Sequence, residues 1–124
     1  MITINYQLKT PLYEQIADQF QLMILKGVLQ PDEQMPSVRS LASKLSINPN
    51  TIQKAYTQLE QQGYIYPIKG RGNFVCNTEH ISREEKDRFF HELGTLLRYG
   101  HDLGIKKEEL SAFMENFYNN GGNI

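Results

Sequence analysis

The stretch that decides the fold is Pro36 to Val75, PSVRSLASKLSINPNTIQKAYTQLEQQGYIYPIKGRGNFV. Its pattern predicts a short helix, a three-residue turn, a longer helix and a two-stranded hairpin with a Lys-Gly-Arg-Gly tip. That order is typical of a winged helix-turn-helix, whose second helix fits the major groove of DNA. We therefore expect a mainly α fold with a small β-wing.

Capping residues predict where both helices of this stretch begin. Ser37 is a good N-cap for a helix that ends near Leu45. Asn48 followed by Pro49 predicts the next start, because asparagine can accept from the first N–H groups and proline is tolerated in the first turn. Gly63 then predicts the end of the second helix.

The longer helix, from Pro49 to about Gln62, has two unlike faces. Four apolar residues are spaced to face a core, namely Ile52, Ala55, Tyr56 and Leu59. The opposite face is polar and contains Asn50, Thr51, Gln53, Lys54 and Thr57. A protein interface would favour aromatic or aliphatic anchors at such positions. The polar face therefore favours DNA, and a winged helix used only for protein contact is the alternative.

Two β-prone runs, 64–66 and 73–75, flank the hairpin tip at 67–72. The glycines of the tip permit positive φ and a close approach of the backbone to another surface. Lys69 and Arg71 alternate with these glycines and should project from the tip. In isolation this pattern indicates an ordinary hairpin with a solvated charged tip, but its place directly after a helix-turn-helix favours a DNA-contacting wing.

The residues before Pro36 predict a strand and one helix. The alternation of Ile2, Ile4, Tyr6 and Leu8 with polar residues predicts a short, half-buried strand. Thr10 followed by Pro11 predicts a capped helix start, and Lys26-Gly27 predicts the end of that helix. Its expected apolar face consists of Leu12, Ile16, Phe20, Met23 and Ile24.

Beyond Cys76 the pattern changes to two amphipathic helices. Ser82 to Glu85 fits the S-x-x-E capping box and predicts the first start. A break is expected at 99–104 and a frayed tail at 119–124. The two apolar faces contain more large side chains than a hairpin of about forty residues can bury within itself.

Packing against a second copy of the chain would cover these faces. We therefore predict a winged helix-turn-helix DNA-binding domain at 1–77 and a helical dimerisation region at 78–124. The expected dimer interface comprises Phe89, Phe90, Leu93, Leu96, Leu97, Leu110, Phe113, Met114 and Phe117. A small-molecule effector between these helices, near Phe89, Leu93, Phe113 and Phe117, is the less favoured interpretation of the same residues.

The net charge of −1 conceals two segments of opposite sign. Residues 34–77 contain five Lys or Arg and one Glu, a net charge of +4. Residues 78–124 contain six Lys or Arg and nine Asp or Glu, a net charge of −3. A basic segment joined to an acidic one is expected for a DNA-binding module followed by a separate pairing module.

The remaining composition argues against membrane, secreted and enzymatic functions. The 124 residues are 40% hydrophobic, and no apolar run has the length of a membrane span. The N-terminus lacks a secretory pattern and Cys76 is the single cysteine, so we expect a cytoplasmic protein. His80, His91 and His101 are ten or eleven residues apart, unlike metal ligands on one helical face. We expect no cofactor, no metal and no catalytic residues.

The same stretch resembles the GntR-type transcriptional regulators. The resemblance rests on PSVRSLA, the Asn-Thr-x-x-x-Ala-Tyr pattern at 50–56, Leu59, Gly63 and the Gly-Arg-Gly-Asn-Phe-Val run at 70–75. It covers about residues 10–76. The short two-helix tail with Leu-Gly-Ile at 103–105 is similar to the YtrA subfamily, whose members have no large effector domain. Two departures are Pro49, where relatives often have arginine, and Lys106, where they often have a capping serine or aspartate.

The resemblance implies a repressor of its own operon, often one with membrane transport genes. By geometry, two copies related by a two-fold axis would read an inverted repeat, with the helix from Pro49 in the major groove and the wing in the adjacent minor groove, which attracts arginine. Relatives use the arginine that matches Arg39 to contact a guanine, whereas the alternatives for Arg39 are a phosphate clamp or a surface ion pair. Lys54 is better placed for the DNA backbone, and Tyr56 is expected to offer its hydroxyl to a phosphate.

These considerations give one set of candidate DNA-binding residues. It consists of Ser37, Arg39, Asn48, Pro49, Asn50, Thr51, Lys54, Tyr56, Lys69, Gly70, Arg71 and Gly72. The expected partners are double-stranded DNA and a second copy of the chain. The sequence identifies neither the operator nor an effector.

Overall fold

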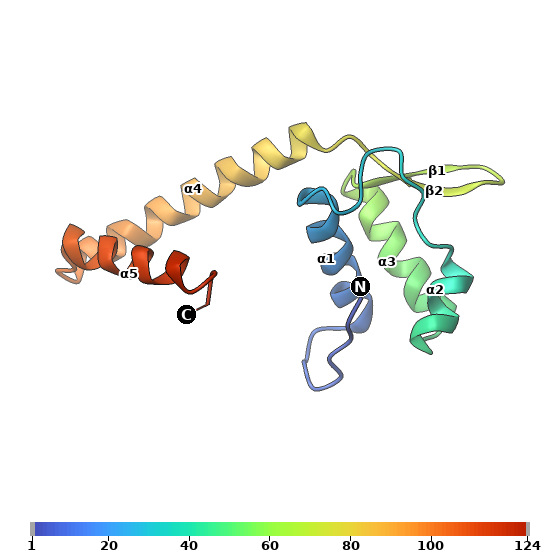
Figure 1. Ribbon diagram of the computed structural model, residues 1–124, viewed down its shortest axis with the longest axis horizontal. Helices are drawn as coiled ribbons and strands as arrows, with labels where there is room; N and C mark the ends of the chain where they lie inside the picture. Colours follow the sequence, from blue (N-terminus) through green and yellow to red (C-terminus); the bar gives the residue numbers. More distant parts are fainter. Residues whose placement is uncertain (1, 124) are drawn as a thin grey trace. The chain divides into compact units, whose positions relative to one another are not determined.

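The computed structural model describes residues 2–123 and contains helices and one two-stranded sheet (Figure 1). The chain forms two compact units that divide between Arg83 and Glu84. The elements are α1 (Leu12–Leu25), α2 (Val38–Leu45), α3 (Pro49–Gln61), β1 (Ile65–Ile68), β2 (Gly72–Val75), α4 (Glu79–Asp102) and α5 (Lys107–Asn119). The predicted mainly α fold with a small β-wing is confirmed. Within residues 2–123, no helix has the length and apolarity needed to cross a bilayer.

The core of the first unit forms around α3, which packs against α1, α2 and β1. In Figure 1, α3 lies between α1 and α2, and these two outer helices share few contacts with each other. The four predicted core residues of α3, Ile52, Ala55, Tyr56 and Leu59, are all buried. Tyr56 meets Phe20 of α1 edge to face, with ring centroids 5.8 Å apart. Burial of one face of α3 therefore leaves its polar face in solvent.

Side-chain caps start α2 and α3, as predicted. The Ser40 N–H donates to Ser37 Oγ at 3.0 Å, and the Asn50 N–H donates to Asn48 Oδ1 at 2.8 Å. Between the helices Ser46 takes a left-handed conformation with φ of 55°. Such a residue reverses the chain direction within a short turn. The helix-turn-helix is thus specified by local side-chain chemistry.

The wing is an antiparallel hairpin that pairs Ile65 with Val75 and Ile68 with Gly72. Residues 32–35 run beside β2 on its other side. The Met35 N–H donates to the Asn73 carbonyl at 2.8 Å, and Gln34 Nε2 donates to the Arg71 carbonyl at 2.8 Å. The segment that leads into α2 therefore also supports the wing, a contact that the sequence did not predict.

The N-terminal segment is not a strand, and that prediction was wrong. Its backbone is bonded instead by two glutamine side chains of α1. Gln19 exchanges hydrogen bonds with Thr3 N and O, and Gln15 does the same with Asn5 N and O. Ile2 and Ile4 pack against the core, whereas Tyr6 and Leu8 are exposed. Extended backbone needs hydrogen-bond partners, and here side-chain amides supply them in place of a neighbouring strand.

The start of α1 also differs from the prediction. Pro11 occupies the N-cap position without a side-chain hydrogen bond, and the helix begins at Leu12. The Thr10 side chain makes no cap, and the Thr10 carbonyl accepts from Gln15 Nε2 at 3.0 Å. The predicted end is confirmed, because Gly27 follows the helix with φ of +77°.

The helix α4 begins at Glu79, three residues before the predicted capping box at Ser82. Asn77 Oδ1 accepts from the Glu79 N–H at 3.1 Å and so provides an earlier start. The first turn of α4 belongs to the first unit, where Ile81 packs against the core. An added Cβ at Gly63 would lie 3.2 Å from Ile81 Cδ1, so the end of α3 and the start of α4 fit closely. Burial of Ile81 explains the earlier start.

The predicted break at 99–104 is shorter than expected. The helix α4 continues to Asp102, Gly104 turns the chain with φ of +81°, and α5 begins at Lys107. Lys106 occupies the N-cap position and makes no side-chain cap. Asn119 still belongs to α5, and the Gly122 N–H donates to the Phe117 carbonyl at 2.9 Å. The predicted frayed tail is thus a turn as far as Asn123, and Ile124 lies outside the described residues.

Gln15 is the one buried polar residue among residues 2–123 and makes three hydrogen bonds to the N-terminal segment. We expect Gln15→Leu to lower the free energy of unfolding by about 2–3 kcal/mol, because backbone groups of Asn5 and Thr10 lose their partners. Urea unfolding followed by circular dichroism measures this change. Gln19→Leu is the control and should cost less, since the Gln19 bonds are exposed to water. Equal losses in the two variants would contradict the burial argument.

The Tyr56 hydroxyl donates to the Pro36 carbonyl at 2.7 Å, and the residue is 1% exposed. Burial raises the pKa of Tyr56 well above its usual value of 10.0. The stability contributed by the protonated hydroxyl is therefore fully present below pH 10 and is lost as the pH rises beyond it. We expect Tyr56→Phe to cost about 1–2 kcal/mol at pH 7 and to flatten the loss of stability between about pH 10 and 11.5. Urea unfolding at each pH tests this, and an unchanged pH slope would contradict it. Tyr6→Phe, at an exposed position outside the core and the tail helices, is the control.

Candidate nucleic-acid interface

The polar face of α3 begins at the N-terminus of the helix. Asn48, Pro49, Asn50 and Lys54 are exposed, and Thr51 is half-buried. The first N–H groups are already bonded within the chain: that of Asn50 to Asn48 Oδ1, and that of Thr51 to the Asn48 carbonyl at 2.9 Å. Because these N–H groups are not free, a phosphate here would meet polar side chains and the helix dipole.

Arg39 lies in the first turn of α2 and is exposed. Over the described part of the chain, no carboxylate lies within ion-pair distance of its guanidinium, in contrast to the surface pair of Arg88 with Glu85. The ion-pair alternative for Arg39 is thus not observed. Ser37, directly before α2, uses its hydroxyl as the helix cap. The structure therefore gives Ser37 a positioning role and leaves the Arg39 donors available to a partner.

Tyr56 lies in the core, as predicted for its ring. Its hydroxyl bonds the Pro36 carbonyl, one residue before the cap of α2, so its single hydrogen is not presented to solvent. A phosphate oxygen needs exactly such a donor hydrogen. The bond instead ties the middle of α3 to the start of α2 and fixes where Arg39 emerges.

Lys54 lies beside a residue that the sequence did not single out. Its Nζ is 4.1 Å from the centroid of the Tyr13 ring, at the distance of a cation–π contact. The Tyr13 hydroxyl donates to Glu14 Oε1 at 3.1 Å, and this bond raises the pKa of Tyr13. The first turn of α1 therefore borders the polar face of α3. No periodicity distinguishes Tyr13, because the contact joins residues far apart in the chain.

The wing carries the remaining candidates, Lys69, Gly70, Arg71 and Gly72, all of them exposed. Gly70 and Gly72 have φ of +77° and +111°, which non-glycine residues rarely adopt. An added Cβ at Gly72 would lie 3.3 Å from Gln34 Nε2, whereas Gly70 has open space around it. The glycines thus serve the turn and the close approach of the segment before α2.

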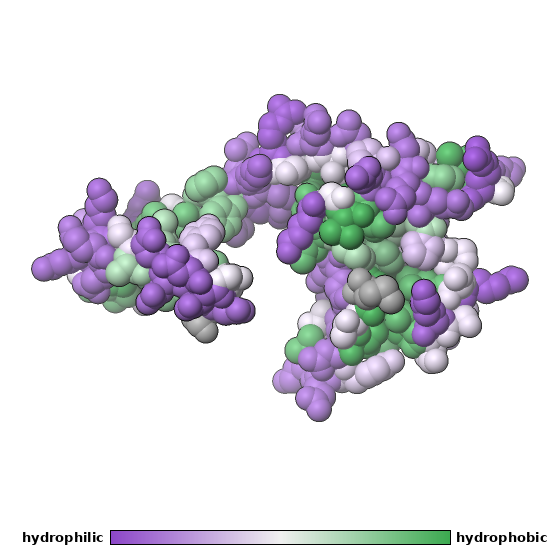
Figure 2. Space-filling model, viewed as in Figure 1, coloured by the Kyte–Doolittle hydropathy of each residue, from purple (hydrophilic) through white to green (hydrophobic). Residues whose placement is uncertain are grey.

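Aromatic contacts stiffen the base of the wing. Tyr66 stacks on Phe74 with ring centroids 5.9 Å apart, and the Arg71 guanidinium lies 5.9 Å from the Phe74 centroid. The Tyr66 hydroxyl donates to Asp32 Oδ1 at 2.7 Å, which raises the pKa of Tyr66. Arg71 is therefore held near the hairpin, while Lys69 is exposed at its tip. In Figure 1 the hairpin extends on the side of α3 where α2 lies, and Figure 2 shows much of the wing as hydrophilic surface.

The second unit has no apolar core of its own. Among its described residues only Gly100 is buried, and α4 and α5 share few contacts with each other. Six predicted interface residues are exposed: Phe89, Phe90, Leu96, Leu97, Phe113 and Met114. The other three, Leu93, Leu110 and Phe117, are half-buried. Tyr99, Leu103 and Tyr118 are also exposed and extend the apolar surface beyond the prediction.

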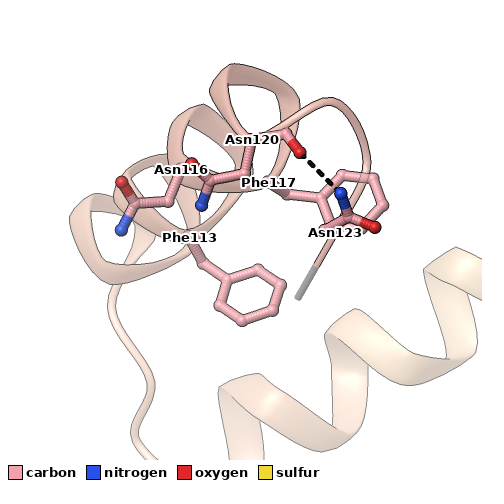
Figure 3. A pocket seen from close by; sticks show the side chains of 5 residues that line it. All are labelled: Phe113, Asn116, Phe117, Asn120 and Asn123. Atoms are coloured by element: carbon pink, nitrogen blue, oxygen red, sulfur yellow. Dashed lines mark hydrogen bonds between the residues drawn. The ribbon is translucent and has the colours of Figure 1, made fainter.

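A small depression lies on α5 and the turn that follows it (Figure 3). Its volume is about 160 Å³, and its lining consists of Phe113, Asn116, Phe117, Asn120 and Asn123. Asn123 Nδ2 donates to the Asn120 carbonyl at 3.0 Å. Of the four residues suggested for an effector site between the tail helices, only Phe113 and Phe117 line this depression.

The described residues contain no group of three or more His, Cys, Asp or Glu side chains that could hold a metal ion. Cys76 is half-buried, and burial, together with the Asp32 charge, raises the pKa of its thiol. A raised pKa lowers the fraction of the reactive thiolate. The candidate nucleic-acid interface offers cations, amides and hydroxyls, which are the groups that contact DNA phosphates and base edges.

Comparison with known proteins gives the same picture. The family described as bacterial regulatory proteins, gntR family, matches residues 12–75. The HTH-type transcriptional repressor YtrA of Bacillus subtilis (strain 168) is 38% identical over 93% of this chain and 90% of its own. A crystal structure of a transcriptional regulator from Oenococcus oeni has a TM-score of 0.74 at 30% identity and covers 95% of this chain and 99% of its own.

A crystal structure of AraR(DBD) in complex with operator ORR3 has a TM-score of 0.53 at 28% identity and covers 60% of this chain and 89% of its own. These relatives are regulators of transcription and not enzymes. The winged helix-turn-helix, its matching family profile and the full-length similarity to a short repressor lead to one conclusion: the chain belongs to the GntR family of bacterial transcriptional regulators.

Proposed function

We propose that this regulator is a homodimeric repressor that reads an inverted repeat, with α3 in the major groove and the wing in the adjacent minor groove. The observation that carries the proposal is the exposed polar face of α3 together with the exposed Arg39 on α2, the helix that packs against α3. An α-helix fits the major groove, where base edges differ in their donors and acceptors. The proposed target is its own operon, with transporter genes as its candidate content.

The candidate contacts divide into two kinds. Arg39, Asn50 and Thr51 are the proposed readers of bases or groove edges, since arginine and amide side chains match base edges. Lys54 and Lys69 are the proposed phosphate contacts, which supply affinity but no sequence information. Arg71 is the proposed minor-groove contact, because a narrow minor groove attracts arginine. Asn48 and Pro49 are proposed to border the groove at the start of α3, and Gly70 and Gly72 to let the wing backbone approach the DNA.

Ser37 and Tyr56 act through their neighbours in this proposal. Ser37 caps α2, and Tyr56 bonds the Pro36 carbonyl immediately before that cap. Both fix the first turn of α2, from which Arg39 emerges. A shift of this turn by about 1 Å would misplace a bidentate arginine contact, whose geometry is rigid.

The apolar surfaces of α4 and α5 support the proposed dimer. Exposed Phe, Leu and Met side chains on both helices have no counterpart within the unit, and burying them against a second copy removes apolar area from water. Two copies related by a two-fold axis would present two recognition helices to half-sites one helical turn apart, roughly 34–36 Å. We therefore propose residues 1–77 as the DNA-binding domain and 78–124 as the dimerisation region. Ile81, in the first turn of α4, packs against the core of the first unit and so joins α4 to it.

Two relatives support the direction of this proposal. The B. subtilis relative is named a repressor, and the AraR(DBD) structure contains an operator. Acting on chromosomal DNA, a bacterial repressor works in the cytoplasm. The basic segment at 34–77, with a net charge of +4, predicts binding that weakens steeply as salt rises.

Arg39→Ala tests base reading. We expect about 1–3 kcal/mol weaker binding to the upstream DNA of its own gene and a much smaller loss on scrambled DNA, because a bidentate arginine–base contact is lost. Arg39→Lys keeps the charge but not the bidentate geometry and should recover only part of the loss. Fluorescence anisotropy across a salt series measures both affinities.

Arg98→Ala is the matched control, since Arg98 is exposed on α4 outside the winged helix. Equal losses of Arg39→Ala on both DNAs would assign Arg39 to phosphates instead of bases. Selection from a random DNA library then distinguishes an operator elsewhere from a protein that reads no sequence. Failure to enrich any sequence would overturn the proposal.

Leu96→Glu tests the dimer. A carboxylate in the proposed apolar interface should raise the dimer dissociation constant at least tenfold, because the charge loses its hydration without a partner. His91→Glu is the matched control, since His91 is exposed and lies about 140° from Leu96 around α4. Sedimentation velocity over a concentration series reports the monomer–dimer equilibrium. A wild-type chain that sediments as a monomer at all concentrations would reject the dimer.

A further inference from the structure

The first unit contains an apolar groove on the side of α2 that faces α1. The helix α3 packs against both α1 and α2, which share few contacts with each other, and the groove lies between these two helices. The groove has a volume of about 370 Å³, and its walls include Phe20 and Met23 of α1 and Leu41 and Leu45 of α2. Figure 2 shows green apolar surface in this part of the unit. The volume falls within the range of small-molecule sites, which is about 300–1,000 Å³.

The polar lining of the groove is sparse and of one sign. Ser40 and Lys44 of α2 are the side chains in the lining that carry a hydroxyl and an ammonium group, and Lys44 is the one charged residue among the described residues of the lining. Within residues 2–123, no carboxylate forms an ion pair with Lys44. Apolar walls with one or two convergent polar groups are the usual composition of a ligand site. A ligand that satisfies all of these groups has a hydrocarbon body and one negative charge.

We infer that this groove binds an amphipathic monocarboxylate, with its hydrocarbon chain or ring against Phe20, Met23, Leu41 and Leu45 and its carboxylate at Lys44 and Ser40. Burial of the apolar body supplies the binding free energy, and the ammonium and hydroxyl groups fix the orientation. No covalent step is involved. The size of the groove suits a chain of about eight to twelve carbon atoms.

The position of the groove connects ligand binding with DNA binding, an extension that rests on the proposed function. Ser40 and Lys44 lie on the same eight-residue helix as Arg39. A ligand between α1 and α2 moves this short helix against α3 and neutralises a cation of the basic segment. Both effects oppose DNA binding, and by linkage DNA weakens the ligand to the same degree. The carboxylate is therefore an inducer that releases the repressor.

The tail depression is a weaker candidate for the same role. Its volume of about 160 Å³ is below the usual range for ligands, and its lining contains no charged residue. The apolar surfaces of α4 and α5 also bind hydrocarbon chains non-specifically if they are exposed. A test of the groove therefore has to separate it from the tail.

The methyl signals of the methionines, measured on the whole chain without DNA, can distinguish binding in the groove from binding on the tail helices. Met23 lines the groove, Met35 is buried in the core, and Met114 is exposed on α5. In protein labelled with ¹³C at the methionine methyl groups, octanoate should shift the Met23 signal saturably and leave Met114 unchanged. Substitution to leucine at each position assigns the signals. A shift of Met114 alone would place the ligand on the tail, and no saturable shift at Met23 would overturn the inference.

Lys44→Met tests the carboxylate contact. The variant should bind octanoate roughly three- to tenfold more weakly, the range for loss of a partly exposed charged contact, while binding of uncharged 1-octanol stays the same. Lys86→Met is the matched control, because Lys86 is exposed on α4 and remote in sequence from the groove lining. Equal weakening of octanoate and 1-octanol would show a structural effect of the substitution and would contradict the charge contact.

The regulatory extension has its own readout. Saturating octanoate should weaken operator binding by at least fivefold in fluorescence anisotropy, the lower end of typical allosteric coupling. The methyl shifts need no DNA, so a protein that binds octanoate at Met23 but no operator would refute the proposed function alone. Octanoate binding at Met23 with unchanged operator affinity would refute the regulatory extension and leave the ligand site.

Discussion

Burial of one face of α3 is the constraint on which the rest of the first unit depends. Ile52, Ala55, Tyr56 and Leu59 are buried between α1, α2 and the wing, so the opposite face is left in solvent. Removing these side chains from water stabilises the unit and at the same time orients the polar face. The Tyr56 bond to the Pro36 carbonyl extends this control to the start of α2. Stability and recognition thus depend on the same helix.

The second unit differs from the first in how its apolar side chains are covered. Its helices are amphipathic, yet their described residues enclose no core, and their large apolar side chains are exposed or half-buried. A surface of this kind is stable in water only when another surface covers it. The groove between α1 and α2 is a smaller case of the same condition, with Lys44 in its lining.

Local chemistry made much of the fold predictable. The caps at Ser37 and Asn48, the end of α1 at Gly27 and the hairpin all follow from the preferences of single residues. Two of the wrong predictions share one cause, because a distant partner outweighed a local preference. Glutamine side chains of α1 replaced a strand partner for the N-terminus, and burial of Ile81 moved the start of α4 ahead of its capping box.

In the candidate site, too, some features follow from local preferences and others from contacts between distant residues. Composition and capping act over a few residues, so they already specify which residues carry charge and amide groups, which face of α3 is polar and where the short helices begin. The bond of Tyr56 to Pro36, the contact of Tyr13 with Lys54 and the groove between α1 and α2 depend instead on the tertiary structure. Those contacts join residues distant in the chain, and their geometry depends on how the helices pack.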